Sequence, residues 1–179
     1  MARKPHNHEG HQEERRVSSR FVVKLLATLT ILLCAVTARA QQMPNPYGAP
    51  ISLDNAKKAA AAAVAEARKN NWTMAFAVVD PNGTLVYYEK LDNTQIGSAA
   101  VAISKARSSA LFKRPTKTFE DALAKGGDGL RTLGLDGAVP LEGGIPIVMD
   151  GKIVGAIGVS GGASAQDVQC AQIGADALK

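Results

Sequence analysis

The sequence predicts an α+β domain in which an antiparallel sheet is flanked by helices. Two strand-like stretches, 73–80 and 84–91, are joined by a Pro-Asn-Gly turn. A second pair, 145–149 and 152–160, is joined by Asp150-Gly151. Helical patterns precede, separate and follow these hairpins. Hairpins rather than strand–helix–strand units favour an antiparallel sheet over a parallel nucleotide-binding one.

The amino-terminal 40 residues differ in charge from the rest of the chain. They hold seven Lys or Arg residues and three acidic residues, whereas residues 41–179 hold 14 Lys or Arg residues and 13 acidic residues. The net charge of +5 therefore comes mainly from the first segment. A nearly neutral domain lacks the basic surface that binds nucleic acid, so nucleic acid is not an expected partner.

This first segment has the pattern of a secretory signal peptide. Four Lys and Arg residues flank a mostly apolar run over 25–36, and Ala38 and Ala40 supply small residues at the cleavage-determining positions. Twelve helical residues rise only about 18 Å, short of a hydrocarbon core of roughly 30 Å. We expect residues 1–40 to be removed, leaving a periplasmic or secreted protein with no membrane span. An uncleaved amino-terminal anchor is the alternative.

The remaining chain divides into a short leader and one domain. Residues 41–50 contain three prolines and a glycine, which predicts a flexible leader before a domain at 51–179. Ser52 is a good N-cap for an alanine-lined helix that runs to about residue 70. Asn82-Gly83 predicts a tight hairpin with positive φ angles between the first two strands.

The second half of the domain contains further helices and the second hairpin. We expect a helix at 95–112, stopped by Pro115, and a shorter one at 119–125. A glycine-rich loop follows at 126–144, with a helical turn near 130–135, and loops of this length are often functional. The strand 152–160 is apolar enough to be central. A last helix over 165–178 completes the order α-β-β-α-α-β-β-α.

Four motifs in this order resemble the GlcG/HbpS family, which includes the carboxy-terminal domain of PduO-type proteins. They are AVVDPNGTLVYYEKLD, SKARSSALFKRPT, GGIPIVMDGKIVGAIGVSGG and QDVQCAQIGADAL. The resemblance spans 51–178 and implies a profilin/roadblock-like sandwich that assembles into symmetric homo-oligomers. It also implies haem binding or haem degradation in some members, and a link to glycolate or diol metabolism in others.

The sequence departs from the haem-binding pattern of that family. No histidine follows residue 40, so the commonest haem ligand is missing from the expected mature chain. Some members have a histidine on the first helix, where this chain has alanines. Ala138 stands where other members have a threonine. Apolar residues around Ala100 and Ile103 stand where others have an acidic pair. Haem would be held by packing or by an unusual ligand. The candidate ligands, each of which is better explained as a leader or core residue, are Tyr47, Met43, Met74 and Met149.

The predicted binding residues lie on the 95–112 helix and in the glycine-rich loop. Lys105 and Phe112 share a helical face, so Lys105 would meet a carboxylate or haem propionate while Phe112 forms an apolar wall. The alternative is a solvated Lys105 and a core Phe112. Arg107 is a further anion-binding candidate, as is Arg114. The pair Gly143 and Gly144 would let a ligand approach the backbone, or would simply form a turn.

No catalytic constellation is evident, because a general base at neutral pH would have to be a perturbed carboxylate or lysine. The spacing of the acidic residues predicts no metal site. Cys170, the single cysteine after residue 40, is expected in the core. Enzymatic activity is left open. We expect an exported, oligomeric binding protein for haem or a related tetrapyrrole. The alternatives are a binder or enzyme acting on small, glycolate-like organic acids and a structural oligomer that binds another protein.

Overall fold

The computed structural model describes residues 44–179 of the chain, and the statements below concern that range. The predicted signal peptide (1–40) and the first residues of the predicted leader lie outside it. The predicted order of helices and strands is confirmed, and the helical turn predicted near 130–135 is part of a 3-10 helix, η1. The elements are α2 (Leu53–Lys69), β1 (Ala75–Val79), β2 (Leu85–Lys90), α3 (Ser98–Phe112), α4 (Lys117–Ala124), η1 (Gly127–Gly134), β3 (Gly144–Met149), β4 (Lys152–Ser160) and α5 (Ser164–Asp176).

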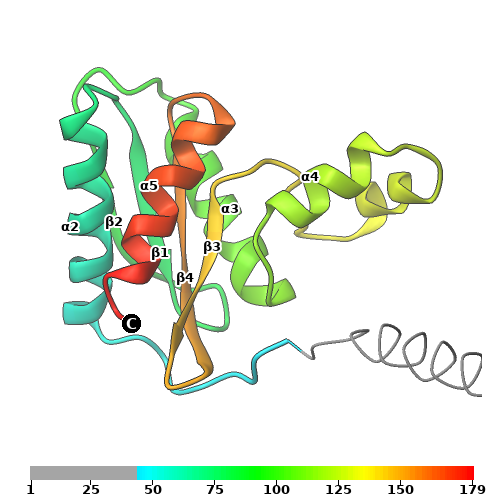
Figure 1. Ribbon diagram of the computed structural model, residues 1–179, viewed down its shortest axis with the longest axis horizontal. Helices are drawn as coiled ribbons and strands as arrows, with labels where there is room; N and C mark the ends of the chain where they lie inside the picture. Colours follow the sequence, from blue (N-terminus) through cyan, green and yellow to red (C-terminus); the bar gives the residue numbers. More distant parts are fainter. Residues whose placement is uncertain (1–43) are drawn as a thin grey trace, which may run out of the picture. The chain divides into compact units, whose positions relative to one another are not determined.

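The strands form one antiparallel sheet in the order β2-β1-β4-β3, which confirms both the predicted fold class and the central place of β4. Figure 1 shows α2 and α5 on one face of the sheet and α3 on the other. The helix α4 and η1 project beyond the edge strand β3 (Figure 1). Among the described residues, no helix is long and apolar enough to cross a membrane.

The two faces of the sheet carry cores of different composition, because successive side chains of a strand point to opposite faces. The face toward α2 and α5 is built from large side chains of the strands and the predicted alanine face of α2. The face toward α3 is built almost entirely from alanine. The first core includes Phe76, Val78, Ile157, Val159, Ala56, Ala60, Ala63 and Ala67, and the second includes Ala75, Ala77, Ala156, Ala102, Ala106 and Ala110.

Small residues allow the backbone of α3 to lie directly on β4. A β-carbon added to Gly158 would lie 2.1 Å from the carbonyl oxygen of Ala102 and 2.5 Å from the amide nitrogen of Ala106. No side chain other than hydrogen fits at this position without moving the helix. The residue at 158 therefore fixes the distance between α3 and the sheet.

The first hairpin differs from the predicted turn. Only Gly83 has a positive φ (79°), and Asn82 does not. The amide of Gly83 donates to the carbonyl of Asp80 and the amide of Asp80 to the carbonyl of Thr84, which makes a three-residue loop ending in a glycine bulge. The carboxylate of Asp80 favours this loop because it accepts the amides of Asn82 and Thr84, each at 2.9 Å.

Part of the segment predicted as a flexible leader is bound to the sheet. β1 pairs only with residues 156–160 of β4, which leaves the start of β4 open on that side. There the amide of Ile153 donates to the carbonyl of Pro46, and the amide of Gly48 donates back to Ile153, both at 2.8 Å. The amide of Ile51 donates to Val154 at 2.8 Å. The unpaired backbone of β4 explains why residues 46–51 are ordered.

We predict that Gly158→Ala lowers the free energy of unfolding by about 2–3 kcal/mol, because the added methyl group overpacks the contact between α3 and β4. Urea denaturation of the chain from residue 41 measures this, since both core clusters and their partly buried neighbours lie between Ile51 and Leu178. The matched control is Gly134→Ala, where an added β-carbon has no neighbour within 4 Å. Equal stability of the two variants would contradict the prediction.

Candidate functional site

The side chain of Lys105 is engaged inside the protein. Its ammonium lies 2.7 Å from Oδ2 of Asp167 on α5 and 3.1 Å from the carbonyl oxygen of Val159 on β4. The two charged side chains are 3% and 4% exposed. The ion pair thus joins the helices that cover opposite faces of the sheet, and the predicted contact of Lys105 with a ligand would require this pair to open.

The carboxylate of Asp167 is held by more than the ammonium. Its Oδ1 accepts the amide of Gly162 at 3.0 Å, at the start of α5. Burial raises the pKa of Asp167 above its ordinary value, while the hydrogen bond and charge of Lys105 oppose that rise. A carboxylate removed from water in this way needs its partner, so the pair is a structural link between helices.

The structure brings Gly143 and Gly144 together with Lys105. A β-carbon on Gly143, whose φ is 119°, would lie 2.8 Å from the carbonyl of Val159 and 3.0 Å from the Lys105 ammonium. One on Gly144 would lie 2.4 Å from the carbonyl oxygen of Lys105. The two glycines permit another group to lie close to their backbone. Among the described residues, that group is the protein's own helix α3. Their predicted role toward a ligand stays a prediction.

Phe112 and Arg107 lie on different flanks of α3. Phe112 is half-buried and packs edge to face on Phe119 of α4, with ring centroids 5.2 Å apart. The guanidinium of Arg114 lies over the Phe119 ring, 5.6 Å from its centre. Arg107 is about 200° around the helix from Lys105. Its Nε donates to the carbonyl of Gly83 at 2.9 Å. The five predicted residues therefore do not line one cavity.

A different cluster forms at the carboxyl end of α3, and we call it the α3 ledge: Tyr47, Arg107, Leu111 and Lys113. The Tyr47 hydroxyl donates to the carbonyls of Ala110 and Leu111 at 2.9 and 3.0 Å. The Lys113 ammonium lies over the Tyr47 ring at 4.1 Å. Tyr47 and Leu111 are 42% and 47% exposed, and both Arg107 and Leu111 pack on the Gly83 turn.

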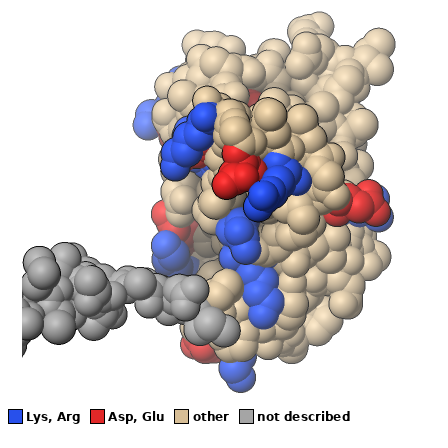
Figure 2. All heavy atoms as spheres, turned by 90° about the vertical axis from the view of Figure 1, so that its right-hand side faces the viewer, with Lys and Arg blue, Asp and Glu red and all other residues tan. Residues whose placement is uncertain are grey.

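The ledge combines exposed apolar surface with positive charge. No acidic residue occurs from 93 to 119, which is the sequence signal that could have indicated such a cationic region. Tyr47 was predicted as a candidate haem ligand, but its contact with the end of α3 carried no sequence signal because the residue comes from the predicted leader. On the molecular face that carries α4, Figure 2 shows Lys and Arg side chains with Asp and Glu side chains among them. This arrangement suits a flat apolar ligand that bears carboxylates.

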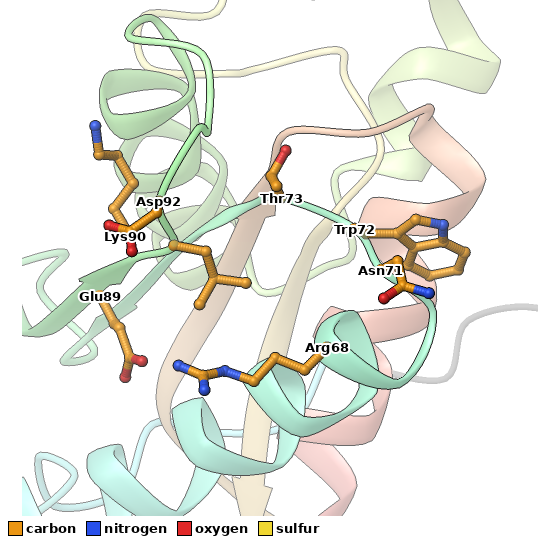
Figure 3. Close-up of a pocket in the computed structure, with 8 residues that line it drawn as sticks. Arg68, Asn71, Trp72, Thr73, Glu89, Lys90 and Asp92 are labelled. Carbon is orange, nitrogen blue, oxygen red and sulfur yellow. The ribbon is translucent and has the colours of Figure 1, made fainter.

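A polar pocket of about 480 Å³ lies elsewhere, where α2 ends and β2 ends. Its lining includes Arg68, Trp72, Thr73, Glu89 and Leu91. Figure 3 shows Arg68 extending from α2 toward Glu89, while Lys90 points away from Arg68. Among residues 44–179, no carboxylate lies within ion-pairing distance of the Arg68 guanidinium. None of the predicted binding residues lines this pocket.

A smaller pocket of about 370 Å³ lies between the start of α2 and the β3–β4 turn, lined by Ile51, Asn55, Met149 and Lys152 among others. None of the five predicted site residues lines either pocket. The Met149 sulfur accepts the Asn55 amide at 3.8 Å.

The candidate ligand Met43 lies outside the described residues, and the two remaining sulfur atoms of residues 44–179 are buried. Burial raises the pKa of the Cys170 thiol to about 12, and Met74 has no exposed surface. Within the described range, no group of three or more His, Cys, Asp or Glu residues is placed to hold a metal ion.

Comparison with known proteins gives the family. A family model described as haem degrading protein HbpS-like matches residues 51–176, which includes every helix and strand of the domain. The chain belongs to the HbpS-like family. The protein GlcG of Escherichia coli is 41% identical over 100 residues, which cover 56% of this chain and 73% of GlcG. The predicted GlcG/HbpS resemblance is confirmed.

Solved structures of this HbpS-like family support the same fold. A double mutant of HbpS from Streptomyces reticuli superimposes with a TM-score of 0.68 at 30% identity, covering 78% of this chain and 94% of that one. A structure described as a PduOC:heme complex gives a TM-score of 0.66 at 26% identity, covering 73% and 96% of the two chains. The antiparallel sheet with helices on both faces is therefore shared with these proteins.

We predict that Lys105→Met lowers the free energy of unfolding by about 3–5 kcal/mol, because it leaves the Asp167 carboxylate buried and unpaired. The double variant Lys105→Met with Asp167→Leu removes both charges and is expected to cost less than the single one. Urea denaturation compares them. As a control, Lys117→Met breaks an exposed pair with Asp121 and is expected to change nothing measurable. A Lys105→Met protein as stable as the wild type would contradict the structural role.

Proposed function

We propose that this chain is an exported, self-associating haem-binding protein of the HbpS-like family and that haem lies on the α3 ledge. The observation that carries the proposal is the family match over the whole domain, together with a relative of the same fold whose structure is described as a heme complex. Fold alone would not support a ligand, because one fold hosts many functions.

The ledge residues fit the organic part of haem. Leu111 and the Tyr47 ring offer apolar surface to the porphyrin, and Arg107 and Lys113 offer cations to its two propionates. When bound, haem would supply an iron centre for redox or oxygen chemistry. The described residues fit the iron less well, because the Tyr47 hydroxyl already donates its proton to two carbonyls and burial raises its pKa.

Export and self-association rest on separate observations. The pattern of residues 1–40 supports export, since an apolar run between a positive flank and small residues is what a signal peptidase recognises. Exposed leucines on and around η1 support self-association, because exposed large apolar side chains that are close in the sequence can be buried against a partner. These leucines are Leu130, Leu133, Leu135 and Leu141.

The sample for the test is the full-length gene product expressed in a bacterial host. Intact-mass measurement is expected to give a chain beginning at residue 41, and light scattering on the same sample is expected to give a multiple of that mass. A soluble product that keeps residues 1–40 would contradict export, and a monomer would contradict self-association.

We predict that haemin added to this protein produces a shifted Soret band, saturating at micromolar concentration. Arg107→Ala and Lys113→Ala should each weaken binding about threefold to tenfold, because each removes one partner of a propionate. Arg131→Ala is the matched control, since this arginine lies on η1 and is 83% exposed in an ion pair with Asp128. Spectra that equal the sum of protein and free haemin would rule out the proposed function.

The polar pocket favours a second candidate function, the binding of a small hydroxy acid. Its Arg68 guanidinium is available to a carboxylate, and Thr73 and Asn71 line the same pocket. Glycolate is then expected to raise the melting temperature of the wild type but not of Arg68→Ala. Lys58→Ala, an exposed change on the same helix, is expected to keep the shift. A shift that survives Arg68→Ala would place the acid elsewhere.

A further inference from the structure

We infer that this protein recognises porphyrins by their ring and carboxylates and not by their iron, so that it binds metal-free protoporphyrin about as tightly as haemin. The inference rests on the proposed function, since it names the ligand class of the same ledge. It follows from the state of each polar atom on the ledge.

Neither cation of the ledge has a lone pair to offer a metal. An arginine guanidinium stays protonated in proteins, and Nε of Arg107 already donates to Gly83. The Lys113 nitrogen lies 4.1 Å from the centre of the Tyr47 ring, in the geometry of an ammonium held over an aromatic face. Both groups can accept a carboxylate as partner, and neither is a ligand for iron.

The Tyr47 hydroxyl is the remaining polar atom, and its proton is in use. It donates to the carbonyls of Ala110 and Leu111, two of the last carbonyls of α3. A tyrosinate, the form that binds iron, would place a negative oxygen about 3 Å from two carbonyl oxygens at the negative end of the helix dipole. Burial raises the pKa of Tyr47 in the same direction. The ledge therefore holds Tyr47 as a neutral phenol.

Charge and apolar contact remain as the sources of affinity. The propionates and the outer edge of the ring are the same in haemin and in metal-free protoporphyrin, which differ at the ring centre, so both should gain the same interactions with Arg107, Lys113 and Leu111. A bond from protein to iron would favour haemin, and each tenfold preference corresponds to about 1.4 kcal/mol. Without such a bond, the two dissociation constants are expected to agree within about threefold.

The experiment compares haemin with metal-free protoporphyrin IX on the full-length gene product as purified. Quenching of the fluorescence of Trp72, the single tryptophan of the chain, gives both dissociation constants, and porphyrin absorbance checks them. The variants are Tyr47→Phe and a double change, Arg107→Ala with Lys113→Ala. A variant with His6, His8 and His11 changed to alanine removes the imidazoles of any uncleaved amino terminus.

We expect the ratio of the two dissociation constants to stay within threefold in the wild type, in Tyr47→Phe and in the histidine variant. The double change should weaken both porphyrins alike, by tenfold or more. Haemin binding more than tenfold tighter than protoporphyrin would overturn the inference and leave the proposed function standing. A preference for haemin that Tyr47→Phe abolishes would overturn it and identify the iron ligand. Binding of neither porphyrin would instead remove the proposed function itself.

Discussion

The contact between the backbone of α3 and β4 sets the geometry on which the other features depend. With hydrogen as the side chain at Gly158 and alanines on the facing surface of α3, the helix lies closer to the sheet than larger side chains would permit. This places the ammonium of Lys105 level with the end of β4, where it reaches Asp167 and the carbonyl of Val159. A helix held farther out would need a longer side chain to make the same bonds.

The close packing of α3 on the sheet also explains why the basic residues on and next to this helix have different roles. Lys105 faces the sheet edge beneath Gly143 and is buried, whereas Arg107 is on the flank and exposed. Lys113, just past the last turn, lies over an aromatic ring. Burial alone separates a cation that stabilises the fold from cations that remain available to a ligand. A positively charged helix end is thus left on the surface by the way α3 packs.

The approximate ends of the helices and strands were predictable from the sequence, because caps and turns are determined by neighbouring residues. The Ser52 hydroxyl accepts the amide of Asn55 at the start of α2, and Asp150 and Gly151 both adopt the positive φ angles of a two-residue turn. The two hairpins then predicted an antiparallel sheet, and the family resemblance implied how the helices cover it.

The site was less predictable because its contacts are long-range. Asp167 is 62 residues from Lys105, and Tyr47 is 63 residues from Ala110, so periodicity within one helix gives no information about either partner. Helical spacing correctly placed Lys105 on the face it shares with Phe112, but it does not tell whether that face meets solvent or a buried acid. The first hairpin shows the same limit on a smaller scale, since the carboxylate of Asp80 selected a loop that the Asn-Gly pair alone does not specify.

The attachment of residues 46–51 to β4 has a consequence for how the protein behaves at high concentration. The start of β4 would otherwise present unpaired backbone groups to a strand of another molecule, and exposed backbone of this kind is a template for aggregation. Pro46, Gly48 and Ile51 already occupy those groups through hydrogen bonds of 2.8 Å. This short stretch therefore protects the protein against pairing with its own copies along that part of β4.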